Sequence, residues 1–448
     1  MASRYQQPAG WTLQAFQFAL DPTPEQWQAI RRQWGGRRYA FNWTVRTMKA
    51  DMEAWRATGE SGEAPSFYGL RKRWNEEKNA ECVDRETGEL WWPEVSKEAF
   101  ADGVKGAVDA YWRWQQSGAG KLEGRKVGFP RFKRKGRDED RATFTTGVIR
   151  VEPDRRHVTL PRIGTVRVHE NTRRLQRLVA KDRARILAAT VKRVSDRAIV
   201  VFRVEVARPQ RGHPDPASTV GIDVGVRVLA TVATAEAVIQ RVANPAPLDA
   251  GLSALRRVSK AISRSQKGSN RHHRKEQRRK RLQARIAAVR RNGIHRLTTR
   301  LAKTHGQIVV EGLDAAGMLR QKGLPGSRSR RRALADAALG ETRRQLRYKT
   351  GWYGSELVEA DRFFPSSKTC HGCGHVQDIG WAEHWTCDGC GARHQRDDNA
   401  AINLARHASP VGPVGASVKR GADRKTRRAG QVAEKREVRK DNSERSAA

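Results

Sequence analysis

The pattern of hydrophobic and polar positions divides the N-terminal half of the chain into three regions. Residues 11–20 alternate as a half-buried strand does, and residues 21–25 then supply a helix cap and a helix-opening proline. A helical, tryptophan-rich pattern follows to residue 116, broken at the Gly/Ser/Pro-rich stretch 59–66. Short apolar runs between residues 128 and 206 are typical of a small barrel or curled sheet. We expect the first strand to join this sheet, which leaves the helices as an insertion.

The C-terminal half alternates strands with helices. Residues 252–302 hold the densest positive charge, yet apolar side chains recur there at helical spacing, which predicts two basic helices that each bury one face. The break between them is expected near residues 267–270. From about residue 412 the chain is charged, free of aromatic residues and low in apolar content, so we predict disorder there. The apolar positions of the basic helices are Leu282, Ile286, Val289, Leu297 and Leu301.

Composition indicates a polyanionic partner. The chain has 88 Lys and Arg against 48 Asp and Glu, a net charge of +40 over 448 residues, which favours nucleic-acid binding that weakens with salt. Ribosomal and chromatin proteins share such charge but seldom have 13 Trp and 38% hydrophobic residues. The N-terminus has no apolar signal segment, and no run approaches the roughly 18 apolar residues of a membrane helix.

Acidic residues stand where three predicted elements end. Asp223 closes a strand that turns at glycine into a hairpin, Glu311 closes an apolar strand, and Asp397 and Asp398 begin a helix. Carboxylates brought to one sheet edge can hold two divalent metals about 3.5–4 Å apart, as in phosphodiester hydrolysis. The alternatives are an exposed turn aspartate at 223 and simple helix capping at 397 or 398. The order of elements favours an RNase H-like plan with Mg²⁺ or Mn²⁺ as the metal.

Four of the five cysteines form two Cys-x-x-Cys pairs. Cys370 and Cys373 are separated by thirteen residues from Cys387 and Cys390, and each pair contains a glycine suited to a tight turn. This spacing predicts one structural Zn²⁺ held by four thiolates, because the segment has too few apolar residues to fold on its own. Cys82 stands alone, and we expect no role for it. The possible substitute ligands are His371, His375, His384 and His394.

Taken in order, these motifs resemble the TnpB proteins and the miniature type V CRISPR effectors, which are RNA-guided DNA endonucleases with a RuvC core. The resemblance spans most of the chain. One departure is Gln395, where the family commonly has aspartate, and it puts the rate of cleavage or the metal preference in question. The matching segments are 23–26, 38–43, 128–135, 160–164, 221–225, 310–313 with 317–318, 365–370 and 396–401.

The resemblance implies an α/β multidomain fold with a RuvC nuclease core, an inserted zinc ribbon, and an N-terminal β-barrel wedge domain that carries a helical recognition insertion. It identifies Asp223, Glu311 and Asp397 as the metal-binding catalytic triad and prefers Asp397 to Asp398. The implied domains are a wedge domain in two parts (1–30 and 128–212), a recognition domain (31–127), a RuvC domain in two parts (213–365, with bridging helices 252–302, and 394–411), a zinc ribbon (366–393) and a charged tail (412–448).

The resemblance further implies guide RNA and double-stranded DNA as partners, a short target-adjacent motif, antiviral defence, a cytoplasmic, nucleoid-associated prokaryotic location, and a monomer. Trp43 or Phe132 could stack on bases, although most tryptophans are expected in the core. The longer leading segment favours a CRISPR effector over a transposon-encoded TnpB nuclease. Two further alternatives are an RNA-guided DNA-binding protein with weak or no cleavage, which Gln395 would favour, and a zinc-ribbon RNA-binding protein without enzymatic activity.

Overall fold

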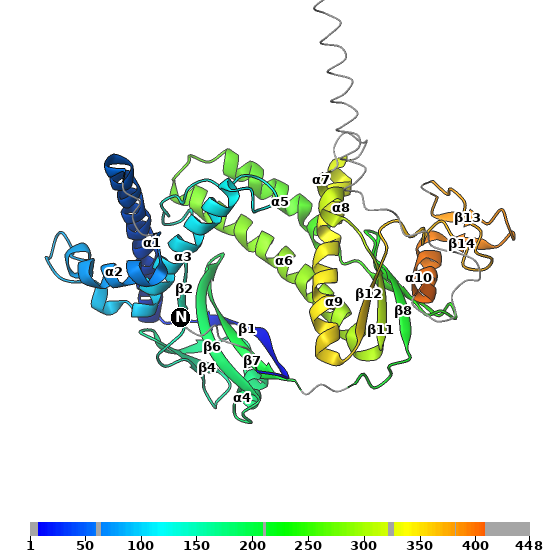
Figure 1. Cartoon of the computed structure of the whole chain (residues 1–448), viewed down its shortest axis with the longest axis horizontal. Coiled ribbons are helices and arrows are strands. Elements are labelled where there is room, and N and C mark those ends of the chain that lie inside the picture. Colours follow the sequence, from blue (N-terminus) through cyan, green and yellow to red (C-terminus); the bar gives the residue numbers. More distant parts are fainter. Residues whose placement is uncertain (1–7, 60–63, 209–211, 321–326, 381, 408–448) are drawn as a thin grey trace, which may run out of the picture. The chain divides into compact units, whose positions relative to one another are not determined.

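The computed structural model describes residues 8–59, 64–208, 212–320, 327–380 and 382–407 (Figure 1). They fall into two compact units. Unit 1 lies within residues 1–216, 245–306 and 315–356, and unit 2 within 217–244, 307–314 and 357–448. The tail predicted from residue 412 lies outside the described residues. Among the helices that the structure describes, none combines the length and apolar character needed to cross a lipid bilayer.

Unit 1 contains a seven-stranded sheet in the order β2-β6-β7-β1-β5-β4-β3, and all of its strand pairs are antiparallel. The first strand pairs with β7 from Trp11 to Ala19 and then with β5 at Leu20 and Asp21. The prediction that this strand joins the later sheet is therefore confirmed. The strands are β1 (Trp11–Asp21), β2 (Arg141–Phe144), β3 (Arg150–Val151), β4 (His157–Leu160), β5 (Gly164–Val168), β6 (Ala184–Val194) and β7 (Arg197–Ala207).

Three helices between β1 and β2 share one apolar core with this sheet. They are α1 (Pro24–Thr58), α2 (Phe67–Glu81) and α3 (Lys97–Gly118), and the short 3₁₀ turn η1 (Trp92–Glu94) precedes the last. Thr23 caps α1 by accepting from the Gln26 amide, while the Gln26 side chain accepts from the Thr23 amide. The helix runs unbroken through the boundary predicted at residue 30.

The tryptophans of this region confirm the expected apolar core. Trp34, Trp43 and Trp74 are buried together with Phe144 and Phe202 of the sheet. Trp34 also donates from Nε1 to the Val191 carbonyl on β6, at 2.9 Å. The hypothesis that Trp43 stacks on bases is wrong, because only 2% of it is exposed and its Nε1 donates to Glu77. Phe132 is 55% exposed and stays a candidate.

The remaining helices of unit 1 are α4 (Arg173–Val179), α5 (Pro247–Ser263), α6 (Asn270–Thr304), α7 (Ala315–Arg320), α8 (Ser327–Ala337) and α9 (Leu339–Tyr353). The two predicted basic helices are α5 and α6, and their break falls at the predicted place. Ile286, Leu297 and Leu301 are buried on α6, whereas Val289 is 42% exposed, so its predicted burial is wrong. Buried Asp336 accepts from Arg290 and from the Leu248 amide, which ties α8 to α6 and α5.

Unit 2 is built on a five-stranded sheet in the order β10-β9-β8-β11-β12. The hairpin β8–β9 is antiparallel, and β11 lies parallel to β8. The predicted succession of hairpin, helical region, strand and terminal helix is confirmed. The elements are β8 (Thr219–Asp223), β9 (Val228–Ala233), β10 (Ile239–Ala243), β11 (Gln307–Glu311), β12 (Glu356–Ala360), β13 (His384–Thr386), β14 (Arg393–Gln395) and α10 (Arg396–His407).

Candidate metal centres

Asp223 and Glu311 close two neighbouring parallel strands at the same edge of the unit 2 sheet. The register pairs Ile222 of β8 with Val310 of β11, and each acid is the next residue of its strand. Their backbones are thus about one strand spacing, ~4.8 Å, apart. The residues just before the acids are buried and apolar, whereas the acids themselves are half-buried. Each carboxylate therefore lies at the end of its strand, at the edge of the core. The prediction that both acids lie at one sheet edge is confirmed.

Asp397 reaches the same edge on helix α10, which packs directly on β8. A Cβ at Gly221 would lie 2.0 Å from the Ala401 carbonyl oxygen and 2.3 Å from the Ala405 nitrogen, so only glycine permits this approach. Two residues beyond Gly221, the Asp223 carboxyl shares a hydrogen bond with the Asp397 side chain. The structure therefore brings the three predicted acids together from two strands and a helix.

Burial and like charge make this edge electrostatically costly without a cation. Burial, followed by the negative charges of Asp397 and Glu311, raises the pKa of Asp223 to about 7, against the opposing charge of Arg396. Burial also raises the pKa of Glu311, again against the charge of Arg396. Three oxygen donors with one arginine nearby are a donor set that suits Mg²⁺ or Mn²⁺.

Asp398 and Gln395 have different partners from Asp397. The side chain of Asp398 pairs with Arg241, with Nε of that arginine 3.1 Å from Oδ1. Gln395 precedes the first residue of α10, and its Oε1 accepts from the Asp398 amide at 2.8 Å, as an N-cap side chain does. The alternative that Asp397 or Asp398 caps the helix is therefore wrong. Gln395 performs the capping, and Asp397 is left facing Asp223.

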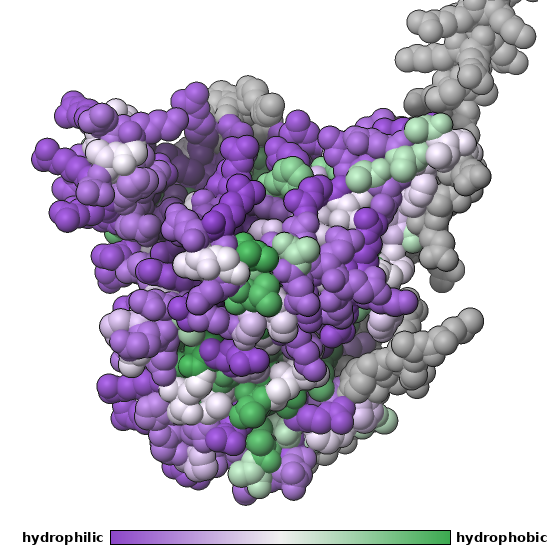
Figure 2. Space-filling model, turned by 90° about the vertical axis from the view of Figure 1, so that its left-hand side faces the viewer, coloured by the Kyte–Doolittle hydropathy of each residue, from purple (hydrophilic) through white to green (hydrophobic). Residues whose placement is uncertain are grey.

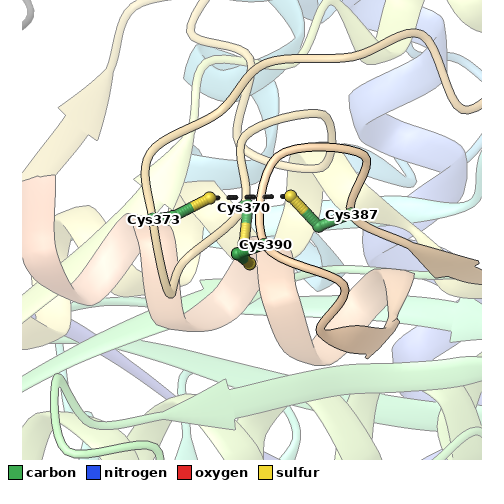
Figure 3. Close-up of side chains that lie close together, drawn as sticks. All are labelled: Cys370, Cys373, Cys387 and Cys390. Carbon is green, nitrogen blue, oxygen red and sulfur yellow. Dashed lines mark hydrogen bonds between the residues drawn. The ribbon is translucent and has the colours of Figure 1, made fainter.

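The four paired cysteines converge on one point in unit 2 (Figure 3). Cys370 Sγ lies 3.8 Å from Cys390 Sγ, and Cys373 Sγ lies 3.6 Å from Cys387 Sγ. Tetrahedral zinc with Zn–S bonds of about 2.3 Å requires S···S separations of about 3.8 Å. The cluster therefore has the geometry to hold one zinc ion, as its spacing predicted.

The surroundings of the cysteines refine two predictions. The glycines inside the pairs do not make the left-handed turns; Gly374 and Gly391, just after each pair, do so with φ of 79° and 72°. The His375 amide helps to lower the pKa of Cys373 to about 7, which favours the thiolate that binds metal. His394 is a neighbour of the cluster, with its Nε2 3.1 Å from Cys370 Sγ, but the group of mutually close donor atoms consists of the four cysteines alone among the described residues.

A distance criterion separates the candidate sites. Among the described residues, two groups have donor atoms that all lie within 4.8 Å of one another: the four cysteines, and His272, His273 and Glu276 on α6. The three acids are not such a group, and a pair of metals needs ligands spread more widely than one ion does. The sequence analysis missed the histidine group, whose signal is His-His-x-x-Glu at helical spacing. It lies among arginines and lysines, which disfavour a cation there.

Unit 1 also presents a strongly basic hollow of about 1100 Å³ that the sequence analysis missed. Arg208 on its rim stacks on Trp352 with 4.2 Å between the guanidinium carbon and the ring centroid. Among the described residues that line it there is no acidic side chain, so it suits phosphate groups. Figure 2 shows that one face of the molecule is largely hydrophilic, with apolar side chains in small patches. The cations of the hollow are Arg173, Arg174, Arg177, Lys181, Arg183 and Arg208.

Three family models match the chain. One described as a probable transposase covers residues 201–322, one described as a Cas12f1-like TNB domain covers 340–404, and one described as a helix-turn-helix domain covers 12–57. The last description differs from the structure, which has strand β1 followed by the single helix α1 over these residues.

Curated relatives match over most of the chain. A Mycobacterium tuberculosis (strain H37Rv) protein, provisionally named an RNA-guided DNA endonuclease, is 63% identical over 431 residues, which are 95% of this chain and 94% of that protein. Escherichia coli (strain K12) InsQ, provisionally given the same name, is 28% identical over 81% of this chain and 84% of its own length. Among solved structures, CasPhi-2 (Cas12j) bound to crRNA matches with 10% identity and a TM-score of 0.40, over 90% of this chain and 98% of that one.

Proposed function

The chain belongs to the family of TnpB-like RNA-guided DNA endonucleases, and from this premise we propose that it hydrolyses DNA at a two-metal site formed by Asp223, Glu311 and Asp397. The observation that carries the proposal is the half-buried Asp223 carboxyl, which lies at the end of β8. It lies against two further acids, and the charge of Arg396 opposes theirs. Such an arrangement is destabilising by itself and becomes favourable when divalent cations bind.

The three acids share one task in this proposal. Asp223 and Asp397, which lie within hydrogen-bonding distance of each other, and Glu311 on the neighbouring strand would hold the ions. Bound Mg²⁺ or Mn²⁺ would lower the pKa of the attacking water and stabilise charge on the phosphate. Rigid strand ends and a capped helix keep the carboxylates in place, so little reorganisation accompanies the reaction. By the RuvC resemblance, the products carry a 5′-phosphate and a 3′-hydroxyl.

The sheet order and its parallel β8–β11 pair support the assignment of unit 2 as a RuvC core. In the same proposal, the sheet of unit 1 is the wedge domain and its helices are the recognition domain. The four cysteines hold one structural Zn²⁺. Guide RNA and target DNA are the partners, and the +40 charge supports their binding. Base pairing with the guide would then select the target sequence.

The matching family and the viral relatives favour the transposon-encoded alternative over a CRISPR effector. The family model covering residues 201–322 is described as a transposase, and more distant viral relatives are named TnpB-like. Sequencing the RNA that copurifies with the protein tests this choice. A guide transcribed from DNA next to the gene supports the transposon alternative, and a guide with CRISPR repeats contradicts it.

The function itself is tested with the purified ribonucleoprotein. The complex is incubated with a plasmid that carries the guide-matched sequence, in Mg²⁺, and the products are separated on a denaturing gel. We expect cleavage that needs both the matched sequence and Mg²⁺. Asp223→Ala should reduce the cleavage rate by more than about a hundredfold. Residues that only support a metal ligand typically change activity by about 10–100-fold, so a larger loss indicates that a ligand itself has been removed. Target binding, measured by gel shift, should stay within about twofold because the substitution leaves the basic side chains unchanged.

Two results would contradict the proposal. Undiminished cleavage by Asp223→Ala would show that the metal site is elsewhere. Guided binding without any cleavage by the unaltered protein would favour the DNA-binding alternative. Gln395, whose side chain caps α10, is the residue on which that alternative rests.

A further inference from the structure

Two buried asparagines on α10 hold the loop that carries the first zinc ligand. Asn399 and Asn403 lie one helical turn apart and are 1% and 7% exposed. Asn399 Nδ2 donates to the Thr369 carbonyl at 2.7 Å, and its Oδ1 accepts from the His371 amide at 3.0 Å. These two hydrogen bonds hold the backbone on both sides of Cys370 against α10.

The second asparagine, Asn403, makes further hydrogen bonds to the same loop. Asn403 Nδ2 donates to the carbonyls of Ser366 and Thr369, at 2.8 and 2.6 Å. One turn further on, Arg406 donates to the His371 carbonyl and, at 3.1 Å, to the Ala235 carbonyl that follows β9. One face of α10 thus satisfies the Thr369 carbonyl and both the amide and the carbonyl of His371, the residues on either side of Cys370. Ordinary apolar side chains cannot replace it, since they would leave buried carbonyls without donors.

The same helix carries Asp397 in its first turn, two residues before Asn399. The zinc cluster also reaches this end of the helix by a second route. Cys370 contacts His394 on β14, and the next residue, Gln395, caps α10. The hydrogen bonds of α10 therefore fix both the loop that contains Cys370 and the helix turn that contains Asp397.

We propose that Asn399 and Asn403 are positioning residues that couple zinc binding in the Cys370 loop to the placement of Asp397, so that the zinc-loaded loop raises the affinity of the acidic site for divalent cations. The inference rests on the proposed role of Asp397 as a metal ligand. Cys370 would be held in place when the four cysteines bind zinc. The hydrogen bonds of Asn399 and Asn403 would then fix α10 relative to this loop and hold Asp397 towards Asp223. Residues that orient a metal ligand typically change metal affinity by about 10–100-fold.

The test compares the guide-bound protein with its Asn399→Ala and Asn403→Ala variants, neither of which adds a charge. Cleavage is measured against Mg²⁺ concentration, and Mn²⁺ binding is measured directly from the electron paramagnetic resonance signal of free Mn²⁺. We expect both variants to keep one zinc per chain and to need about tenfold more Mg²⁺ and Mn²⁺. Asp397→Asn provides the background of ions bound by the RNA.

A double-mutant comparison tests the coupling. Cys373→Ser removes a thiolate outside the segment 366–371 to which the asparagines bond, and it should also raise the Mg²⁺ and Mn²⁺ requirement. If zinc acts through the asparagines, Asn399→Ala should add little in the Cys373→Ser background. Full additivity of the two effects would overturn the proposal. So would an unchanged cation requirement in both zinc-loaded asparagine variants.

Controls separate this inference from a general loss of stability and from the proposed function. Asn42 makes a similar two-bond clamp in unit 1, to the carbonyl and amide of Lys133, so Asn42→Ala should leave the cation requirement unchanged. If Asn399→Ala does not fold, Asn403→Ser, which keeps a small polar group, takes its place. Cleavage by Asp397→Asn would refute the proposed function, whereas an inactive Asp397→Asn beside normal asparagine variants would refute the coupling alone.

Discussion

Gly221 and Ala401 lie in direct backbone contact, because a Cβ at Gly221 would come within 2.0 Å of the Ala401 carbonyl oxygen. This contact sets the distance between β8, which carries Asp223, and α10, which carries Asp397. A methyl group at Gly221 would push the helix away from the strand, since both nearest atoms belong to the backbone. The separation of the two acids therefore depends on a residue that has no side chain.

Gly221→Ala should consequently reduce cleavage strongly, by about a hundredfold or more, while guide binding persists. Initial cleavage rates and guide affinity measure the two effects. Gly35→Ala is the matched control, because Gly35 lies in helix α1, a Cβ added there would have nothing within 4 Å, and alanine favours a helix. Equal activity of Gly221→Ala and Gly35→Ala would contradict the role of the close contact.

The metal-free protein should become less stable as the pH rises from about 4 to about 7. Asp223 has its pKa raised from 3.8 to about 7, so in this window the folded state binds more protons than the unfolded state. Asp223→Asn lacks this titration. Melting temperatures without added Mg²⁺ should therefore agree most closely near pH 4 and favour the asparagine variant by a few degrees at pH 8. A difference independent of pH would argue against an acid with a raised pKa.

The neighbouring acids of α10 should differ in their effect on catalysis. Asp397→Asn should lower the cleavage rate by more than about a hundredfold, because a metal ligand is lost. Asp398→Asn should cost less than about tenfold, because it removes an ion pair with partly exposed Arg241. Arg241→Gln should reproduce the smaller effect. The opposite ranking in single-turnover rates would transfer the ligand role to Asp398.

Zinc binding should depend on the four paired cysteines and not on the fifth. Cys390→Ser should lower the zinc content from about one ion per chain to well below one, and the melting temperature should fall with it. Cys82→Ala is the control, because Cys82 is buried at the end of α2, where burial raises the pKa of its thiol to about 12. Elemental analysis of the purified protein measures the metal. Unchanged zinc in Cys390→Ser would contradict a four-thiolate site.

Most of the elements were predictable because their signals are local. Thr23 and Gln26 cap α1, the break before α6 falls at a Lys-Gly-Ser-Asn segment, and alternating side chains mark β1. Individual side chains were less predictable. Val289 has the right spacing for the buried face of α6 and is nevertheless exposed, and Trp43 is buried where stacking on bases was considered. Spacing indicates a face of a helix, whereas its burial depends on which element packs there.

The sequence by itself determined that three acids end three elements and that four cysteines match the spacing of a zinc site, because strand periodicity, helix caps and turn residues act over a few positions. Only the tertiary structure decided that Asp397 faces Asp223 while Asp398 pairs with Arg241, a residue 157 positions away in the chain. It also decided that Gln395 caps α10 and that Asn399 forms hydrogen bonds to the loop that contains Cys370. These choices depend on electrostatic and hydrogen-bond partners that the folded chain brings close, so no local pattern could reveal them.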